Sequence, residues 1–444
     1  MHRELETAID SNPEARVQQL RSDPRSAYFF HQEPGHDWPE STIAMTVRSS
    51  RTNRRSLWLE RVLVEKLYQQ IGRPPVQLCL WDGTVVGDGQ PHIGGLTIHE
   101  PRVLRHLLLN PLLGFGESYA DGGLTVQGDL VEVLTALNRS LPSGTSSPSR
   151  LWPRTQPRHS FARSKACVYH HYDISNDFYK LWLDPQLVYT CAYYAHPEAT
   201  LDEAQTAKLD HVCRKLRLKP GETVVEAGCG WGALALHMAR KYGVTVRAFN
   251  LSREQLAYAR HRAEVEGLGQ RVEFIEDDYR NMTGRSNAFV SVGMLEHVGP
   301  ENYRGMGKLI GRILTEDGRG LIHSIGRNAA RPLDPWTVKY IFPGAYAPSL
   351  REMMDLFEES GMSVLDVENL RLHYARTCAD WLTRFDQTSG AVRRMFDERF
   401  VRMWRLYLAA SSATFLSGDL QLFQIAFARA GNNDLPWTRA DWYA

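Results

Sequence analysis

The chain has 444 residues, 43% of them hydrophobic and 23% charged, which is typical of a soluble globular protein with two or three domains. Its formal net charge of +1 gives no overall attraction to nucleic acid, so no nucleic-acid partner is expected. The six cysteines contain no C-x-x-C pair, which excludes a disulfide framework and favours a reduced, cytoplasmic setting. The sequence predicts neither a membrane span nor a signal peptide, and contact with a membrane surface stays open.

Residues 1–53 are polar and predict an arm in which we find no functional motif. From residue 54 to 138 the pattern predicts a small α+β domain. It contains a helix at 56–72, strands at 76–83 and 95–100, an apolar helix at 101–116 and a hairpin at 117–128.

A linker rich in Ser and Pro follows at residues 139–168. It has no acidic residue, and its basic residues are Arg139, Arg150, Arg154, Arg158, Arg163 and Lys165. Interleaved Trp152 and Phe161 make this composition suited to an anionic bilayer surface. An ordinary solvated linker would explain the same charges.

Strands and helices alternate from residue 169 to 444. The predicted strands lie at 223–228, 245–250, 272–277, 288–293, 320–326, 363–369 and 422–429. This order predicts an α/β domain with a seven-stranded, Rossmann-like sheet. A helical pattern at 391–416 is expected to pack against the sheet, with the wall of a lipid channel as the alternative.

A glycine-rich turn follows the first of these strands, in "EAGCGWG". Gly228 and Gly230 permit a turn whose backbone comes close to a ligand at the carboxyl end of the strand. The same glycine pattern also occurs in tight turns that bind nothing. The second strand ends in Asn250 instead of an acid, and the G-x-G-x-x-G spacing is absent. The loop therefore favours S-adenosylmethionine over NAD.

Further polar residues are expected around this nucleoside. Glu226 precedes the glycines, and Gln255 lies in the first turn of the next helix. The third strand ends in Asp278 and Tyr279, a carboxylate and a ring at the height of an adenine.

The segment at 169–194 is dense in aromatic and small polar residues, one of them a cysteine. Five of them lie within six positions: Tyr189, Thr190, Cys191, Tyr193 and Tyr194. Buried hydroxyls need partners, and a ring of tyrosines would instead stabilise a sulfonium or a carbocation through its π faces. A metal site of His170, His171 and Cys191 lacks ligand spacing and is not expected.

Acid and imidazole groups follow two neighbouring strands of the predicted sheet. Glu296 and His297 come just after the fourth strand, and His323 and Ile325 lie near the end of the fifth. Each could be an ordinary loop residue, but together they lie at the edge where α/β sheets bind ligands.

Seven ordered motifs carry a resemblance to a known family. They are "YTCAYY", "EAGCGWG", "LSREQ", "SVGMLEHVGPENY", "LIHSIG", "KYIFPG" and "HYARTCADW". Together they resemble the cyclopropane-fatty-acyl-phospholipid synthase family, which includes the mycolic acid cyclopropane synthases, over residues 169–427. "GESYADGG" is similar to the N-terminal lipid-binding domain of its full-length members.

The resemblance implies methyl transfer from S-adenosylmethionine to a cis double bond of an unsaturated phospholipid in the membrane, with bicarbonate as the base that closes a cyclopropane ring. The implied bicarbonate ligands are Cys191, Glu296, His323, Ile325 through its backbone, and Tyr374. The implied cofactor contacts are Tyr189, Thr190, Gly228, Gly230, Gln255 and Tyr279. The sequence departs from the family pattern at two positions. Glu226 stands where family members commonly have Asp, and Asn250 stands where they commonly have Thr.

Other readings stay open. The same carbocation could lose a different proton and give a methylene- or methyl-branched chain. A lipid carrier without catalysis would use the small domain, although the intact glycine loop and base residues argue against it. A dehydrogenase is the weakest alternative, because the sequence lacks the acidic residue that would bind the ribose of NAD. We expect a cytoplasmic protein at the membrane periphery, and a homodimer is an open expectation.

Overall fold

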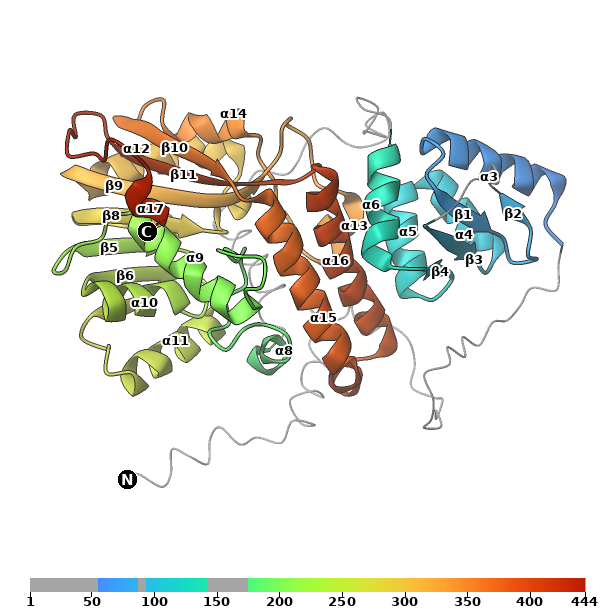
Figure 1. Cartoon of the computed structure of the whole chain (residues 1–444), viewed down its shortest axis with the longest axis horizontal. Coiled ribbons are helices and arrows are strands. Elements are labelled where there is room, and N and C mark those ends of the chain that lie inside the picture. The colour runs from blue at the N-terminus through green and yellow to red at the C-terminus, as the bar shows by residue number, and fades with distance from the viewer. Residues whose placement is uncertain (1–54, 87–92, 142–174, 444) are drawn as a thin grey trace, which may run out of the picture.

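A computed structural model describes residues 55–86, 93–141 and 175–443. Figure 1 shows a large sheet domain at one end of the molecule, a small domain at the other, and a pair of long helices between them. The predicted arm at 1–53 and most of the predicted linker lie outside the described residues.

The large domain is built on a seven-stranded sheet, as the sequence predicts. Its strands are β5 (Thr223–Ala227), β6 (Thr245–Asn250), β7 (Val272–Glu276), β8 (Ser286–Val292), β9 (Leu314–Gly326), β10 (Met362–Asn369) and β11 (Gln421–Arg429). They lie in the order β10-β11-β9-β8-β5-β6-β7. All neighbours pair in parallel except at β11, which is antiparallel to both β10 and β9. The Rossmann-like α/β class is thereby confirmed.

Helices cover both faces of this sheet, because successive strand residues point to opposite sides. Val224 packs in the core beneath α9 (Leu201–Lys215), α10 (Ala233–Tyr242) and α11 (Arg253–Val265). Val225, the next residue, packs in the core beneath α12 (Tyr303–Ile313), α14 (Leu350–Met353) and the 3-10 turn η5 (Met354–Leu356). The carboxyl ends of β5, β6 and β8 are left open for a ligand.

The small domain has a four-stranded sheet in the order β2-β1-β3-β4. Its elements are α3 (Trp58–Gln70), β1 (Val76–Cys79), β2 (Val85–Val86), β3 (Gly94–Ile98), α4 (Pro101–Leu109), α5 (Pro111–Ala120), β4 (Leu124–Gln127) and α6 (Leu130–Ser140). Helix α6 has no counterpart in the sequence prediction. It includes Arg139, which the sequence assigns to the linker.

Two predictions for this domain are wrong in detail. The apolar helix expected at 101–116 is two helices, because Asn110 caps α5 by accepting from the Leu113 N–H at 3.4 Å and Pro111 starts the new helix. The hairpin expected at 117–128 is the end of α5 followed by β4, which pairs with β3.

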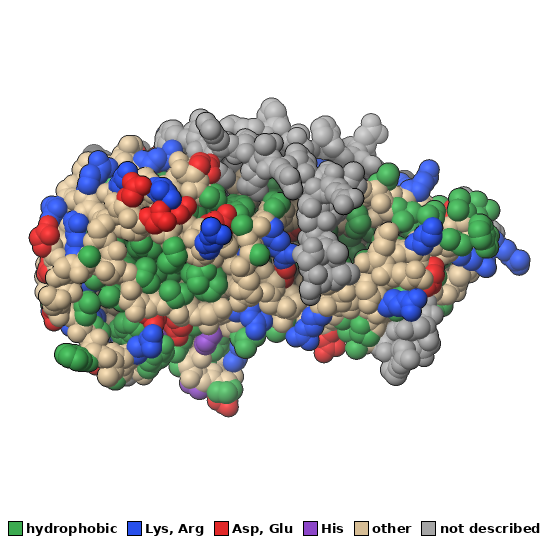
Figure 2. All heavy atoms as spheres, turned by 90° about the horizontal axis from the view of Figure 1, so that it is seen from above, with side chains coloured by type: hydrophobic (Ala, Val, Ile, Leu, Met, Phe, Trp, Pro, Cys, Tyr) green, Lys and Arg blue, Asp and Glu red, His purple; other side chains and the backbone are tan. Residues whose placement is uncertain are grey.

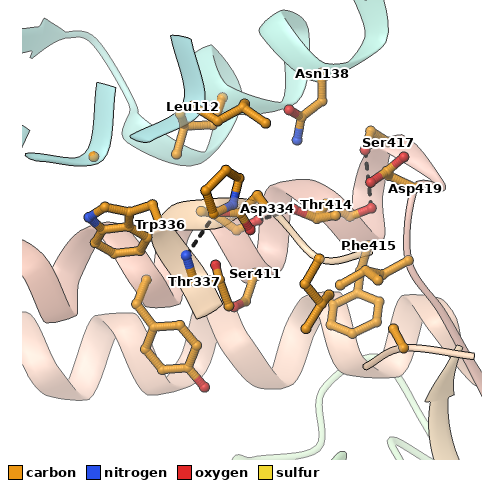
Figure 3. Close-up of a pocket in the computed structure, with 18 of the residues that line it drawn as sticks. Leu112, Asn138, Asp334, Trp336, Thr337, Ser411, Thr414, Phe415, Ser417 and Asp419 are labelled. Carbon is orange, nitrogen blue, oxygen red and sulfur yellow. Dashed lines mark hydrogen bonds between the residues drawn. The ribbon is translucent and has the colours of Figure 1, made fainter. Parts of the chain in front are cut away.

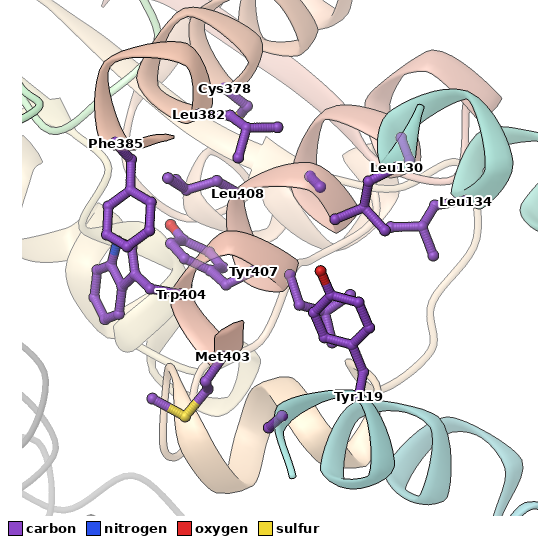
Figure 4. Packing of buried hydrophobic residues seen from close by; sticks show 14 of the residues in the cluster. Tyr119, Leu130, Leu134, Cys378, Leu382, Phe385, Met403, Trp404, Tyr407 and Leu408 are labelled. Atoms are coloured by element: carbon purple, nitrogen blue, oxygen red, sulfur yellow. The ribbon is translucent and has the colours of Figure 1, made fainter. Parts of the chain in front are cut away.

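The helical pattern at 391–416 is divided between α15 (Arg371–Met395) and α16 (Glu398–Ser417). Asp397 starts α16 by accepting from the Phe400 N–H at 2.7 Å. Contrary to the expected packing on the sheet, α16 lies between α15 and the small-domain helices α5 and α6. Figure 4 shows Met403, Trp404 and Leu408 in the same core as Tyr119 and Leu134.

Short elements complete the described chain. They are α8 (Asn176–Lys180), η2 (Tyr279–Asn281), η3 (Leu295–His297), η4 (Pro300–Asn302), α13 (Pro335–Tyr340) and α17 (Ala440–Tyr443). Within the described ranges, every helix is too short or too polar to cross a bilayer.

Candidate active site

The glycine loop after β5 shapes a small cavity at the carboxyl edge of the sheet. Gly230 has φ +54°, and a Cβ built on it would meet no atom within 4 Å. Gly232 has φ +82°, and a Cβ there would come within 2.7 Å of the Phe274 ring. The first glycine therefore leaves space for a ligand, whereas the second permits close packing beneath the loop.

This small cavity has a volume of about 160 Å³. All nine residues predicted to contact the cofactor line it: Tyr189, Thr190, Glu226, Gly228, Gly230, Asn250, Gln255, Asp278 and Tyr279. They come from four separate segments of the chain, so their meeting is a result of the fold.

Some of these side chains hold the cavity wall together. The Asn250 amide donates to the Gly230 carbonyl at 3.2 Å and to Gln255 Oε1 at 2.7 Å. Asp278 accepts from the Arg280 N–H at 2.9 Å and starts η2. We infer that Asn250 fixes the glycine loop and orients Gln255. Its amide can therefore take the place of the Thr hydroxyl that is common at this position in the family.

Glu226 and Lys208 are two buried ionisable residues that line the small cavity. Lys208 donates to Thr190 Oγ1 at 3.0 Å. Burial raises the pKa of Glu226 to about 8 and lowers the pKa of Lys208 to about 8. Glu226 Oε2 has no hydrogen-bond partner among the described residues. The sequence analysis missed Lys208, because "TAKLDH" looks like one more polar stretch of helix.

A second, large cavity of about 1260 Å³ lies between the two domains. Aliphatic and aromatic side chains form most of its wall, from the small-domain sheet (Leu78, Leu96, Ile98), from α6 (Leu134) and from α16 (Leu406, Phe415). Figure 3 shows Leu112 and Asn138 of the small domain facing Thr414 and Phe415 of α16 across it. The two cavities share Tyr189, Thr190, Gly293 and His297, so they adjoin.

Glu296 lies where the large cavity approaches the small one. Its Oε1 accepts from the Ile325 N–H at 2.6 Å, while its buried Oε2 has no partner among the described residues. Burial raises the pKa of Glu296 to about 7. The Ile325 N–H is thus used to position Glu296, and the Ile325 side chain lines the large cavity.

His323 lies two residues before Ile325 and projects from the same face of β9. The Gln424 Nε2 amide, as assigned, lies 3.0 Å from His323 Nδ1. With the amide in this orientation Nδ1 accepts and the neutral ring carries its proton on Nε2, while Gln424 Oε1 is also left without a partner among the described residues. Burial lowers the pKa of His323 well below its usual value, and Nε2 has no partner within the described part of the chain.

Cys191 and Tyr374 complete the predicted base residues. Cys191, Tyr374 and Ile325 pack in one cluster with Leu370 and Leu422. The Cys191 thiol is fully buried and donates to the Ala192 carbonyl at 3.2 Å, and burial raises its pKa well above the usual value. Tyr374 lines the large cavity. The structure therefore brings the five residues to one region, with Cys191 and His323 behind the cavity wall.

The expected ring of tyrosines is wrong. Tyr189 lines both cavities and shares a hydrogen bond of 2.8 Å with Tyr407. Tyr193 instead stacks on His211 and His373, and Tyr194 donates to Asp380 at 2.7 Å. Aromatic groups from distant elements, including Tyr374, Tyr407 and Phe342, line the large cavity in their place.

Comparison with known proteins identifies the family. The family model of mycolic acid cyclopropane synthetase matches residues 159–425. The chain belongs to this family. It is therefore an S-adenosylmethionine-dependent methyltransferase, and the resemblance drawn from the seven motifs is confirmed. A second model, described as a domain of unknown function, matches residues 63–147.

Two relatives align with this chain over most of their own length. A probable fatty acid methyltransferase of Pseudomonas putida is 36% identical over 83% of this chain and 96% of its own. The cyclopropane-fatty-acyl-phospholipid synthase of Escherichia coli K12 is 36% identical over 77% of this chain and 89% of its own. Among solved structures, the mycolic acid cyclopropane synthase CmaA1, complexed with SAH and CTAB, superposes with a TM-score of 0.57 and 29% identity, covering 62% of this chain and all of that one.

Proposed function

We propose that this cyclopropane synthetase family member transfers the methyl carbon of S-adenosylmethionine to a cis double bond of an unsaturated phospholipid acyl chain and closes a cyclopropane ring. The observation that carries the proposal is the junction of the two cavities at Tyr189, Thr190, Gly293 and His297. A nucleoside in one and an acyl chain in the other would meet there. With about 1260 Å³, the large cavity exceeds the roughly 300–1,000 Å³ of ordinary ligand pockets.

The residues of the small cavity fit S-adenosylmethionine. The open space at Gly230 admits a ligand close to the backbone, and Glu226 Oε2, which has no partner among the described residues, can accept from a ribose hydroxyl. Gln255 and Tyr279 complete its wall. When bound, S-adenosylmethionine supplies an electrophilic methyl group.

The residues around Ile325 fit bicarbonate, which would supply a base. His323 Nε2–H is an unpaired donor, and Glu296 Oε2 is an unpaired acceptor among the described residues. Bicarbonate has oxygens that accept and an O–H that donates, so it complements both groups. A Glu296 pKa of about 7 lets this carboxyl hold or release a proton at neutral pH without a large cost. Ile325 positions Glu296, and Tyr374 and Cys191 close the region.

The protein's main contribution to the chemistry is exclusion of water. An alkene is a weak nucleophile, and a carbocation in water would be captured before a proton could leave. Apolar walls of the large cavity keep water from the acyl chain, and the Tyr189 ring at the junction offers a π face to positive charge.

We further propose that the protein acts in the cytoplasm at the surface of an anionic bilayer. Exposed apolar residues lie at the start of α3, where Leu57 and Leu59 are 57% and Trp58 is 77% exposed. Figure 2 shows hydrophobic side chains gathered at that end of the molecule, with Lys and Arg side chains around them. This combination suits a bilayer that also attracts the basic linker. The homodimer stays a prediction.

Analysis of the lipids of a host that expresses the protein tests the proposal. Unsaturated phospholipids should gain one CH₂, and proton NMR should show cyclopropane resonances as olefinic resonances disappear. A retained olefinic signal on the heavier chains would instead indicate the methylene-branched product. Unaltered phospholipids with active cofactor binding would reject the phospholipid substrate.

A further inference from the structure

Two arginines of one loop line the large cavity, and neither belongs to the reaction centre described above. Arg327 follows β9, two residues beyond Ile325, and is 6% exposed. Its Nη1 lies 3.4 Å from Asp419 Oδ2, and its buried Nε has no hydrogen-bond partner among the described residues. Arg331 lines the same cavity and contacts the same Asp419.

The carboxylates near this pair leave one buried donor, the Arg327 Nε–H, without an acceptor among the described residues. Asp419 is shared by both guanidinium groups. Asp334 attracts Arg327 through space, but its Oδ1 accepts from the Thr337 N–H at 2.9 Å as the cap of α13. Burial lowers the pKa of each arginine to about 10, so both stay charged at neutral pH. The pair therefore keeps its charge on a cavity wall that also carries apolar side chains, with the Arg327 Nε–H free to donate to a ligand.

A buried donor without an acceptor destabilises a folded protein, so its presence points to a ligand that accepts from it. The ligand must be an amphiphile, because the arginines share one cavity with apolar residues such as Leu134 and Phe415. Guanidinium groups bind phosphate oxygens in a fork geometry, and a phosphodiester offers oxygens that can accept from the Arg327 Nε–H.

We propose that Arg327 and Arg331 bind the phosphodiester of the phospholipid substrate and thereby place its acyl chain along the large cavity toward Glu296. This assignment rests on the proposed function. A fatty-acid carboxylate would be recognised by the same chemistry, and the experiment therefore includes it as a separate arm.

The alternative is that the arginines only fasten the loop at 327–334 to the chain that follows α16. The two roles predict opposite effects of Asp419→Asn on phospholipid binding. If the arginines bind an anion, Asp419→Asn removes a competing carboxylate and should tighten phospholipid binding. If Asp419 is only a structural partner, Asp419→Asn and Arg331→Gln should both lower the melting temperature and weaken activity together.

The test uses the full chain and mixed micelles of a neutral detergent, which remove surface attraction to a charged bilayer. Three amphiphiles with the same unsaturated chain are compared: phosphatidylglycerol, diacylglycerol and the free fatty acid. Binding is followed by quenching of tryptophan fluorescence with brominated chains, and turnover by transfer of labelled methyl groups. Arg285→Gln is the control, because Arg285 is exposed and paired with Glu316 at 3.1 Å.

For Arg331→Gln we expect KM and the apparent Kd for phosphatidylglycerol to rise at least about tenfold, the loss expected for a hydrogen bond to a charged group. The turnover number, S-adenosylmethionine affinity and diacylglycerol binding should stay unchanged. Arg327→Lys keeps the positive charge but loses the two-pronged guanidinium geometry, so KM and Kd for phosphatidylglycerol should rise less. Asp419→Asn should lower the Kd for phosphatidylglycerol.

An unchanged ratio of phosphatidylglycerol to diacylglycerol affinity in Arg331→Gln would overturn the proposal. A larger loss of affinity for the free fatty acid than for the phospholipid would also overturn it, because the site would then bind a carboxylate. Wild-type protein that binds brominated phosphatidylglycerol through these arginines but methylates none of the lipids would reject the proposed function while supporting the anion site.

Discussion

At the scale of single residues, the proposed bicarbonate site depends on two buried polar atoms, one a donor and one an acceptor. His323 Nε2 carries a proton without an acceptor, and Glu296 Oε2 is an acceptor without a donor, among the residues that the structure describes. Leaving such atoms unpaired costs roughly 1–3 kcal/mol each. A small anion with both an oxygen acceptor and an O–H satisfies both at once, which is the physical case for bicarbonate.

Glu296→Gln should separate catalysis from cofactor binding. The amide keeps the size of the side chain but cannot exchange a proton with the base, so we expect the rate to fall by about 10² to 10⁴. Affinity for S-adenosylmethionine should stay the same, because Glu296 lines the large cavity and not the small one. Initial rates with and without added bicarbonate, beside calorimetric titration of the cofactor, check this. Parallel loss of rate and affinity would show that Glu296 supports the fold of the cofactor site.

The same residue predicts a pH dependence of stability. The folded pKa of about 7 lies above the ordinary value of 4.5, so the folded protein retains a proton that the unfolded chain releases between these values. This contribution, about 3 kcal/mol, is full below pH 4.5 and is lost as the pH rises through 7. Relative to Glu296→Gln, wild-type apoprotein should therefore lose stability between pH 5 and pH 8.5. A difference in melting temperature that does not vary with pH would contradict the buried carboxyl.

Gly230→Val should abolish cofactor binding. A branched side chain would fill the open space above the loop, and the φ of +54° is unfavourable for it. Gly221→Val is the matched control, because Gly221 also has a positive φ of +85° and open space around it but lies outside the small cavity. Calorimetry should detect S-adenosylmethionine binding only in the control. Equal affinities in the two variants would move the cofactor away from this loop.

Sequence reasoning found the small-cavity residues because glycine turns and polar strand ends leave local signals. It missed residues whose role depends on tertiary burial. Lys208 looks like a solvated helix residue, and Arg327 like a loop charge, until the fold places both inside. The tyrosine ring failed for the opposite reason, since adjacent residues of an irregular segment point in different directions.

At the scale of elements, all seven strands of the large sheet were predictable because buried parallel strands form short apolar runs between turn residues. The missed features are breaks within helical patterns. Asn110 and Asp397 each cap a new helix where the apolar periodicity continues across the break. Periodicity alone did not reveal that α16 packs on the small domain, because an apolar helix face does not specify its partner.

Arg402 is expected to fasten the small domain to α16. Its guanidinium donates to the carbonyls of Tyr119 at 2.6 Å and Leu124 at 3.1 Å. Arg402→Met would remove both bonds and should cost about 2–4 kcal/mol of unfolding free energy, with lipid turnover reduced and cofactor affinity kept. Arg399→Met breaks a partly exposed ion pair with Asp121 and a contact of 5.5 Å with the Tyr340 ring, and should cost less, about 1 kcal/mol. Similar losses in chemical denaturation of the two variants would contradict this fastening role.

At the scale of the whole molecule, one cavity wall comes from each domain, so the proposed acyl site exists only when the domains are joined. The small domain supplies Leu96 and Ile98 from its sheet, and the large domain supplies Tyr374 and Phe415. The free end of the small domain carries the exposed apolar residues of α3. A lipid leaving the bilayer at that end would enter the domain that forms half of its binding site.

Trp58→Ser should weaken binding to anionic vesicles. Trp58 is 77% exposed at the start of α3, and inserting part of its ring into the interface is worth about 1.5 kcal/mol, or roughly tenfold in partitioning. Trp437→Ser is the matched control, because Trp437 is fully exposed but belongs to the chain after β11. Co-sedimentation with phosphatidylglycerol vesicles should fall in the first variant only, and binding of both proteins should weaken as salt screens the basic residues. If the two tryptophans contribute equally, or if salt has no effect, the α3 end is not the surface that meets the bilayer.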